Sequence, residues 1–294
     1  MTICIVYLTF ELLTTSYFRK VLQALLSLYE TFVQAPPDNI PARIRNNWGK
    51  MSYFSDVRGA IDGTHILAHV PTAQHAIYRN RKGTLSQNVL AGCSLDMYFF
   101  YVCPGWEGSA NDARVLENAE LNGFPRAENT IYLADAGYGL RKGYLTPYRT
   151  VRYHLREQSR AHLKPKTKEE LFNLRHAQLR NVIERAFGVL RRRFCILNTA
   201  PEYSLDKQAQ LVLVLCALHN FIRHRANGED DEFYRELNVP LEGSDQETGG
   251  VITGTSDQTQ QSGYKLDTRE MILDRDQRAT QMWIDYVNYQ NRER

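Results

Sequence analysis

The segment Val57-Arg-Gly-Ala-Ile-Asp-Gly-Thr-His-Ile-Leu-Ala-His-Val70 holds two short runs rich in β-branched residues, divided by Gly63 and ended by Pro71. Short apolar runs bounded by glycine and proline predict β-strands. The first run closes on Asp62. The segment therefore predicts two consecutive strands, with a carboxylate at the end of the first.

Apolar runs further along the chain extend the predicted sheet. Residues 87–96 and 98–103 predict a hairpin that turns at Asp96-Met97. Residues 130–135 predict another short strand, which ends on Asp135. A second carboxylate is thus expected where a strand leaves the core.

Helical spacing, in which apolar residues recur three and four positions apart, surrounds these strands. One short helix is expected to begin after Asn111 or Asp112, either of which suits an N-cap. Strands followed by helices around one sheet predict an α/β fold with helices on both faces. The helical patterns cover residues 8–34, 113–122, 168–194, 205–225 and 267–290.

Composition restricts the class of protein. The chain has 294 residues, of which 43% are hydrophobic, and this excludes a wholly disordered protein. The five cysteines show no C-x-x-C spacing, which argues against a disulfide framework and a thiolate zinc site and favours a reducing compartment. Glu11 interrupts the apolar N-terminal run well short of about 18 residues, so we expect a core helix and no membrane partner.

The pattern divides the chain into four expected parts. A helical segment over 1–49 precedes an α/β domain over 50–225. Residues 226–266 are expected to be a disordered acidic linker, because eight acids face one base between positions 228 and 247. A C-terminal helix over 267–294 follows.

Three acids occupy positions that suit a metal site. Asp62 and Asp135 end predicted strands, and Glu184 lies beside the apolar seam of a long helix. Oxygen ligands of this kind suit Mg²⁺ or Mn²⁺, and two such ions can promote attack on a phosphodiester. Asp112 is a fourth candidate. From the pattern alone, each acid also has a structural alternative as a turn, cap or solvated helix residue.

Five ordered motifs, which together span about residues 57–222, carry a resemblance to a known family. In order, they resemble the sequence blocks of PIF/Harbinger-type transposases, a DDE endonuclease family that includes domesticated nuclease relatives. The motifs are Gly59-Ala-Ile-Asp-Gly-Thr-His-Ile66, Gly108-Ser-Ala-Asn-Asp-Ala-Arg-Val-Leu116, Tyr132-Leu-Ala-Asp-Ala-Gly-Tyr138, Asn181-Val-Ile-Glu-Arg-Ala-Phe-Gly-Val-Leu-Arg-Arg-Arg-Phe194 and Ala217-Leu-His-Asn-Phe221.

The resemblance implies an RNase H-like mixed sheet flanked by helices, with extra helices at the N- and C-terminal ends. It implies that Asp62, Asp135 and Glu184 are catalytic. It further implies that these three acids, together with Asp112, bind divalent cations. The expected ions are Mg²⁺ or Mn²⁺, and two of them are expected. The implied substrate is DNA. The expected compartment is the nucleus, with the cytoplasm as the alternative.

The chain departs from the family pattern in two places. Asn111 stands where the second block usually has histidine. Only about sixty residues precede Asp62, and they show one strong helical pattern, so residues 1–49 are interpreted as the remnant of a helix-turn-helix region. Sequence-specific recognition would then depend on a separate Myb-like DNA-binding protein, and a homo-oligomer is a further option.

Basic residues gather in one part of a chain whose net charge is only +3. Between positions 141 and 194, fifteen Lys or Arg residues face four acids, with tyrosines interleaved. This pattern favours contact with a phosphate backbone, although a solvated basic face is the structural alternative. The expected DNA contacts are Lys164, Lys166, Arg180, Arg185, Arg191 and Arg192.

These observations predict a divalent-metal-dependent DNA endonuclease of transposase origin. The main alternative is a domesticated, non-catalytic DNA- or chromatin-binding protein. The short N-terminal region supports this alternative. An RNase H-fold nuclease acting on RNA or on ends, and a decayed element copy, are the other readings.

Overall fold

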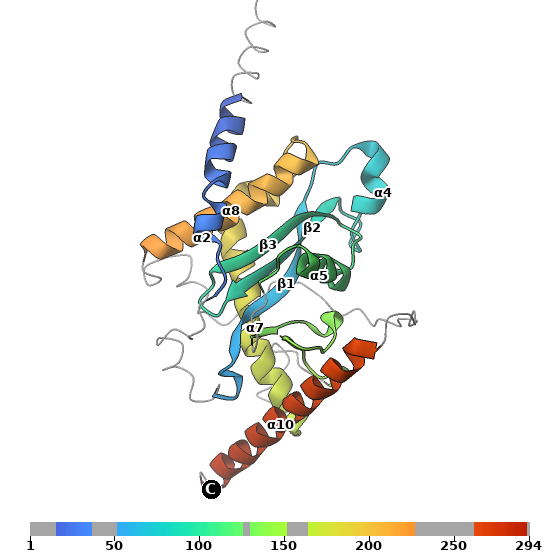
Figure 1. The fold of residues 1–294 in the computed structure, drawn as a ribbon, viewed down its shortest axis with the longest axis vertical. Helices are drawn as coiled ribbons and strands as arrows, with labels where there is room; N and C mark the ends of the chain where they lie inside the picture. Colours follow the sequence, from blue (N-terminus) through green and yellow to red (C-terminus); the bar gives the residue numbers. More distant parts are fainter. Residues whose placement is uncertain (1–15, 37–51, 126–129, 152–163, 227–261, 293–294) are drawn as a thin grey trace, which may run out of the picture.

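A computed structural model describes residues 16–36, 52–125, 130–151, 164–226 and 262–292. Most of the predicted acidic linker, the first fifteen residues and residues 37–51 lie outside this description. No helix among the described residues is long and apolar enough to cross a membrane. The structure is α/β, with one mixed sheet and helices against it (Figure 1).

The sheet has five strands in the order β3-β2-β1-β4-β5. Neighbours β1, β2 and β3 pair antiparallel, whereas β4 pairs parallel with both β1 and β5. This arrangement is RNase H-like, as the sequence predicted. The strands are β1 Val57–Leu67, β2 Ser86–Ser94, β3 Phe99–Glu107, β4 Ile131–Leu133 and β5 Tyr144–Leu145.

Two sequence predictions about the strands need correction. The two expected strands over 57–62 and 64–70 form one strand, β1, because its pairing with β2 runs without a break across Gly63. The connection expected over 141–168 contains the short strand β5, which extends the sheet beyond β4. The predicted hairpin is confirmed, and Met97 adopts a positive φ of 65° in its turn.

The helices bury both faces of the sheet. Ala60 and Leu133 point into the larger core, which the long helices α7 and α8 cover. Their neighbours Ile61 and Tyr132 point into a second core beneath α5. This alternation is the two-residue period of a strand buried on both sides. The helices are α5 Asp112–Leu121, α7 Lys168–Arg193, α8 Leu205–Arg225 and α10 Ser262–Arg292.

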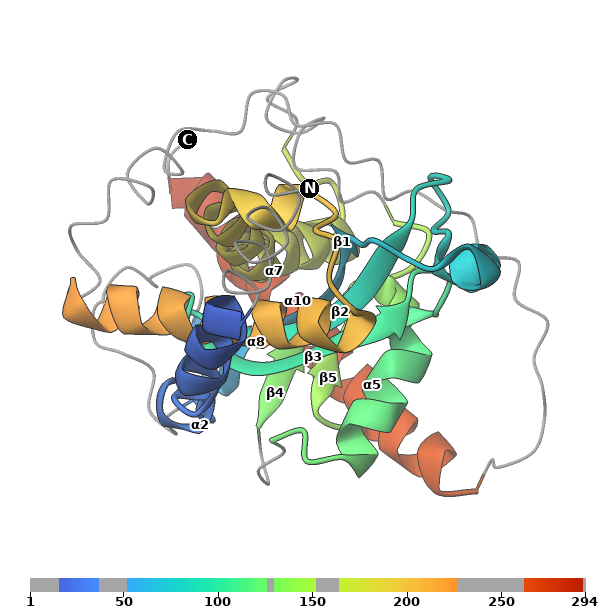
Figure 2. The ribbon, with the colours of Figure 1, turned by 90° about the horizontal axis from the view of Figure 1, so that it is seen from above.

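Short helical segments complete the described chain. Residues 16–26 are helical and lead into α2, which lies against α8 (Figures 1 and 2). The short α-helices are α2 Tyr29–Phe32 and α4 His75–Tyr78, and the 3-10 helices are η1 Ser52–Phe54, η2 Thr72–Gln74, η3 Ala136–Tyr138 and η4 Cys195–Asn198.

Helix α8 is hydrogen-bonded to the edge strand β3 through the buried side-chain amide of Asn220. The Asn220 side chain accepts a hydrogen bond from the Phe99 backbone N–H at 2.9 Å and donates to the Phe99 carbonyl at 2.6 Å. It also donates to the Phe32 carbonyl at 2.8 Å, which ties α2 to the same point. Asn220 and its neighbor His219 are thus buried, hydrogen-bonded core residues.

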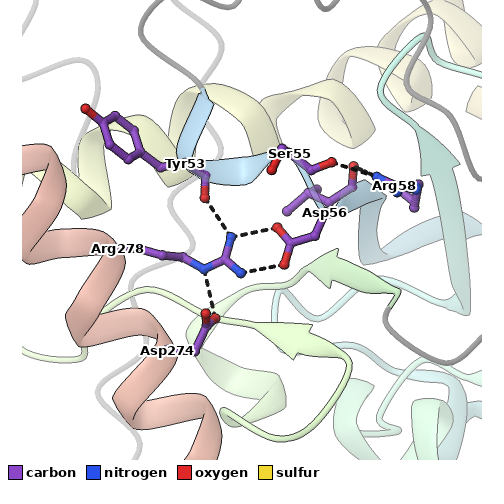
Figure 3. Close-up of polar contacts among 7 residues, drawn as sticks. Tyr53, Ser55, Asp56, Arg58, Asp274 and Arg278 are labelled. Carbon is purple, nitrogen blue, oxygen red and sulfur yellow. Dashed lines mark hydrogen bonds and ion pairs between the residues drawn. The ribbon is translucent and has the colours of Figure 1, made fainter.

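Helix α10 crosses α7, and Arg278 makes several of its polar contacts with the rest of the domain (Figure 1). The Arg278 guanidinium donates to both Asp56 oxygens, at 2.7 and 2.5 Å, just before β1. It also donates to Asp274 at 2.8 Å and to the Tyr53 carbonyl at 2.6 Å (Figure 3). Met271 and Met282 of α10 are buried in the larger core, so this helix is part of the folded domain.

Candidate functional site

Asp62 is the center of the candidate site. It lies within β1, not at the strand end that the sequence predicted, because β1 continues to Leu67. Its side chain is 21% exposed. The Gly63 N–H donates to Asp62 Oδ1 at 2.9 Å, and the Arg180 guanidinium donates to Asp62 Oδ2 at 3.0 Å. Asp62 therefore faces α7.

Glu184 joins Asp62 through the same arginine. It lies one turn after Arg180 on α7, and the Arg180 guanidinium donates to Glu184 Oε1 at 2.6 Å. The Glu184 side chain is 49% exposed, whereas that of Arg180 is 13% exposed. Arg180 therefore bridges a strand carboxylate and a helix carboxylate at the edge of the core.

Asp112 and Asp135 approach Asp62 from the other elements. Asp112 is the first residue of α5, and Asn88 of β2 donates to its Oδ1 at 2.7 Å. It lies against the β1 backbone so closely that a Cβ at Gly63 would stand 2.4 Å from Asp112 Oδ1. Asp135 follows β4 and is the N-cap residue of η3. Glycine after Asp62 thus leaves room for the Asp112 carboxylate.

The charges of the four acids meet at Asp62. Burial raises the pKa of Asp62 to about 7; the Arg180 guanidinium opposes this rise, and the carboxylates of Glu184, Asp135 and Asp112 add to it. Like charges disfavor ionisation of a carboxyl group, and an adjacent cation favors it. Acids that are far apart in the chain therefore share one electrostatic environment. Their catalytic and metal-binding roles stay predictions.

Tyr138 is a site residue that sequence reasoning did not single out. It ends η3, three residues after Asp135, and is 6% exposed. Its hydroxyl has no hydrogen-bond partner among the described residues. Burial raises its pKa well above the usual range, and the carboxylates of Asp62, Asp112 and Asp135 add to the rise. Its place in the third sequence motif was the available signal.

The candidate ligand atoms are of the chemical type that a hard divalent cation prefers. Its candidate ligands are carboxylate oxygens, and the buried Tyr138 hydroxyl leaves one more polar group for an incoming ligand. Within the described ranges, no three His, Cys, Asp or Glu side chains are already arranged to hold a metal ion. The Arg180 guanidinium stands instead between Asp62 and Glu184.

The expected DNA contacts do not form one cluster. Arg180 is engaged by the acids, and the Arg191 guanidinium donates to the Thr64 hydroxyl and to the His65 carbonyl. Lys164 and Lys166 are exposed before α7, and Arg192 is exposed at its end, while Arg185 is half-buried. A helix of 26 residues is roughly 39 Å long, so α7 separates the exposed bases into two groups.

Comparison with known proteins gives one family match. The profile described as DDE superfamily endonuclease matches residues 61–220, more than half of the chain. The matched range begins in β1 and ends in α8, and it includes all four acids of the candidate site.

The curated relatives are similar at a lower level. The human protein named "Putative nuclease HARBI1" is 28% identical over 208 residues, which cover 68% of this chain and 56% of that protein. The Arabidopsis thaliana protein named "Protein ALP1-like" is 29% identical over 200 residues, which cover 61% and 46%. The chain thus spans about half the length of the curated relatives it matches. No solved structure shows a significant match.

Proposed function

This chain belongs to the DDE superfamily endonucleases, in agreement with the PIF/Harbinger-type resemblance, and from this we propose that it cleaves DNA with the help of divalent cations. The observation that carries the proposal is the grouping of acids around Asp62: Arg180 joins it to Glu184 of α7, Asp112 of α5 packs against the adjacent Gly63, and the Asp135 carboxylate adds to the raised pKa of Asp62. A binding module needs no such set of carboxylates.

In this proposal the carboxylates of Asp62, Asp112, Asp135 and Glu184 hold Mg²⁺ or Mn²⁺. When bound, such ions neutralise phosphate charge and promote attack on the phosphodiester. The chain supplies the positioning: the Gly63 N–H orients Asp62 and the Asn88 amide orients Asp112. Preorganised groups of this kind are what phosphoryl transfer demands of the protein.

DNA is the proposed substrate because the chain belongs to the DDE superfamily endonucleases and because exposed basic residues lie near both ends of α7, the helix that carries Glu184. The separation of roughly 39 Å along α7 is close to one turn of B-DNA, about 34–36 Å. Lys164, Lys166 and Arg192 are exposed and suit phosphate contacts. Nuclear localisation, a separate Myb-like DNA-binding protein as partner, and a homo-oligomer belong to the same proposal.

Nicking of supercoiled DNA tests the proposal. Wild-type protein should nick in Mg²⁺ or Mn²⁺, and Asp62→Asn should reduce the rate by more than roughly 100-fold, because even a group supporting a metal ligand is worth about 10–100-fold. Glu117→Gln is the matched control, since Glu117 is an exposed acid of α5. Equal nicking by wild type and Asp62→Asn would contradict the proposal.

A second candidate is a DNA- or chromatin-binding protein without catalysis. The bridge from Arg180 to Asp62 and Glu184 favors it, because an arginine satisfies these carboxylates without a metal ion. DNA binding that persists in EDTA, with no nicking in any divalent cation, would establish this reading over the nuclease.

A further inference from the structure

Arg180 holds two of the proposed metal ligands at once. Its two terminal nitrogens point to different acids, with Nη1 3.0 Å from Asp62 Oδ2 and Nη2 2.6 Å from Glu184 Oε1. One carboxylate comes from the sheet and the other from α7, so the guanidinium spans the seam between the two elements. The contact with Asp62 is the more shielded of the two, because the Asp62 side chain is 21% exposed and the Glu184 side chain is 49% exposed.

A divalent cation that binds Asp62 Oδ2 and Glu184 Oε1 would compete with the guanidinium for the same two oxygens. Mg²⁺ binds carboxylate oxygens at about 2.0–2.1 Å and demands near-octahedral geometry. At the observed contact distances, a guanidinium would stand within a few ångströms of such an ion, and two positive charges at that separation repel strongly in a partly buried site. On these two oxygens, binding of the divalent cation and binding of the guanidinium therefore oppose each other.

We propose that Arg180 is a resident counter-cation, which divalent ions must displace from Asp62 and Glu184 before they bind. This inference rests on the proposed function, because it concerns the same carboxylates. Arg180 then stabilises the acid cluster while no metal is bound and lowers the apparent affinity for the metal. The apparent affinity falls because only the fraction of molecules with the arginine displaced is competent to bind the metal.

Titration of the full chain with Mn²⁺ in the absence of DNA tests the proposal, with free Mn²⁺ measured by electron paramagnetic resonance. Arg180→Gln should bind Mn²⁺ more tightly than wild type by about 10-fold, within the 5–150-fold range of typical coupling between sites. Arg180→Lys should fall between the two, because one ammonium cannot bridge both acids as a planar guanidinium does. Arg175→Gln is the matched control: it removes one charge from the same helix, where Arg175 lies over the Tyr53 ring, and should bind like wild type.

The outcomes separate this inference from the proposed function. If wild type binds Mn²⁺ and Asp62→Asn does not, but Arg180→Gln binds equally or more weakly, Arg180 only positions Glu184 and the competition is refuted. If wild type and Asp62→Asn bind alike, the carboxylates are not the metal site and both proposals fail. Thermal unfolding gives a second readout: Arg180→Gln should be less stable than wild type in EDTA and should gain more from saturating Mn²⁺. A smaller gain than in wild type would contradict the competition.

Discussion

At the scale of single residues, two tyrosine hydroxyls offer a matched comparison. The Tyr138 hydroxyl is buried without a partner among the described residues, whereas the Tyr148 hydroxyl donates to Asp276 at 2.6 Å. Removal of an unpaired buried hydroxyl is neutral or stabilising, but loss of a bond to a charged group costs about 1.5–3 kcal/mol. Urea unfolding in EDTA should therefore show Tyr138→Phe as at least as stable as wild type and Tyr148→Phe as clearly weaker. The reverse order would mean that Tyr138 has a partner in solution.

Two glycines of β1 differ in the atoms that an added side chain would meet. A Cβ at Gly59 would meet the Cys93 backbone carbonyl at 2.2 Å, whereas one at Gly63 would meet the Asp112 carboxylate at 2.4 Å. Backbone cannot yield as a carboxylate can, so Gly59→Ala should cost more than the usual overpacking penalty of about 1–3 kcal/mol. Gly63→Ala should fold with a smaller loss but displace Asp112 and impair nicking. Chemical unfolding and the nicking assay together check this, and equal stability of the two variants would contradict it.

At the scale of elements, Arg278 contributes to the attachment of α10. Its planar guanidinium contacts both Asp56 oxygens, Asp274 and the Tyr53 carbonyl, a geometry that lysine cannot reproduce (Figure 3). Because Asp56 is partly exposed, we expect Arg278→Lys to cost only about 1–2 kcal/mol. Hydrogen exchange should rise along α10 more than along α8. Uniform exchange in both helices would show that the methionines of α10, not this contact, hold the helix.

Two buried histidines make the packing of α7 and α8 sensitive to acid. His176 donates to the Leu145 carbonyl at 2.8 Å and His219 to the Met97 carbonyl at 3.0 Å. Burial lowers the pKa of His176 to about 4 and that of His219 to about 3, below the ordinary 6.5. Since the unfolded chain then binds more protons, their contribution to stability is complete above pH 6.5 and is lost as the pH falls toward 4 and 3.

The raised pKa of Asp62 acts in the opposite sense, because its contribution is complete below pH 3.8 and is lost as the pH rises through about 7. Wild type and His219→Gln both contain Asp62, so its contribution cancels when their stabilities are compared. Between pH 7.5 and 5, wild type should lose about 2 kcal/mol more than His219→Gln, the linkage expected for one histidine over 1.5 pH units. Parallel pH profiles for the two proteins would refute the assignment of a neutral buried His219.

The helices could be predicted closely, because their amphipathic pattern and caps are local. The expected range of 168–194 agrees with α7 to one residue, and Thr167 caps its start by accepting from the Glu170 N–H. Strand β5 was missed, because two residues buried on both sides show no alternation. Gly63 looked like a break between strands, although its role is to admit Asp112, a neighbor that only the fold reveals.

The sequence named the candidate acids, whose roles stay predictions, but it did not indicate the arginine that lies between two of them. The motifs named Asp62, Asp112, Asp135 and Glu184, and the structure brings them into one environment. Arg180 was expected to contact DNA because it lies in a basic segment. Its spacing of four from Glu184 was visible in the sequence, but its second partner is 118 residues away. Long-range pairs of this kind leave no local pattern.

At the scale of the whole molecule, the basic segment is less available to DNA than its count suggests. Arg141 pairs with Glu120, Arg149 donates to a backbone carbonyl, and Arg180 is bridged by acids. Replacement of both exposed lysines, Lys164 and Lys166, by Gln should therefore reduce the slope of log K against log salt by about 1.8, at about 0.9 for each phosphate contact. Fluorescence anisotropy between 50 and 200 mM salt measures this slope. An unchanged slope would place DNA elsewhere on the surface.

The attachment of α10 to the turn before β1 has a consequence for biosynthesis. Asp56 leaves the ribosome more than two hundred residues ahead of Arg278, and the apolar surface that receives Met271 and Met282 stays without its cover during that interval. A nascent chain can form the sheet while α10 is still being translated, but the domain is finished only after its last helix emerges. Molecular chaperones that shield exposed apolar surface would meet this chain at that stage.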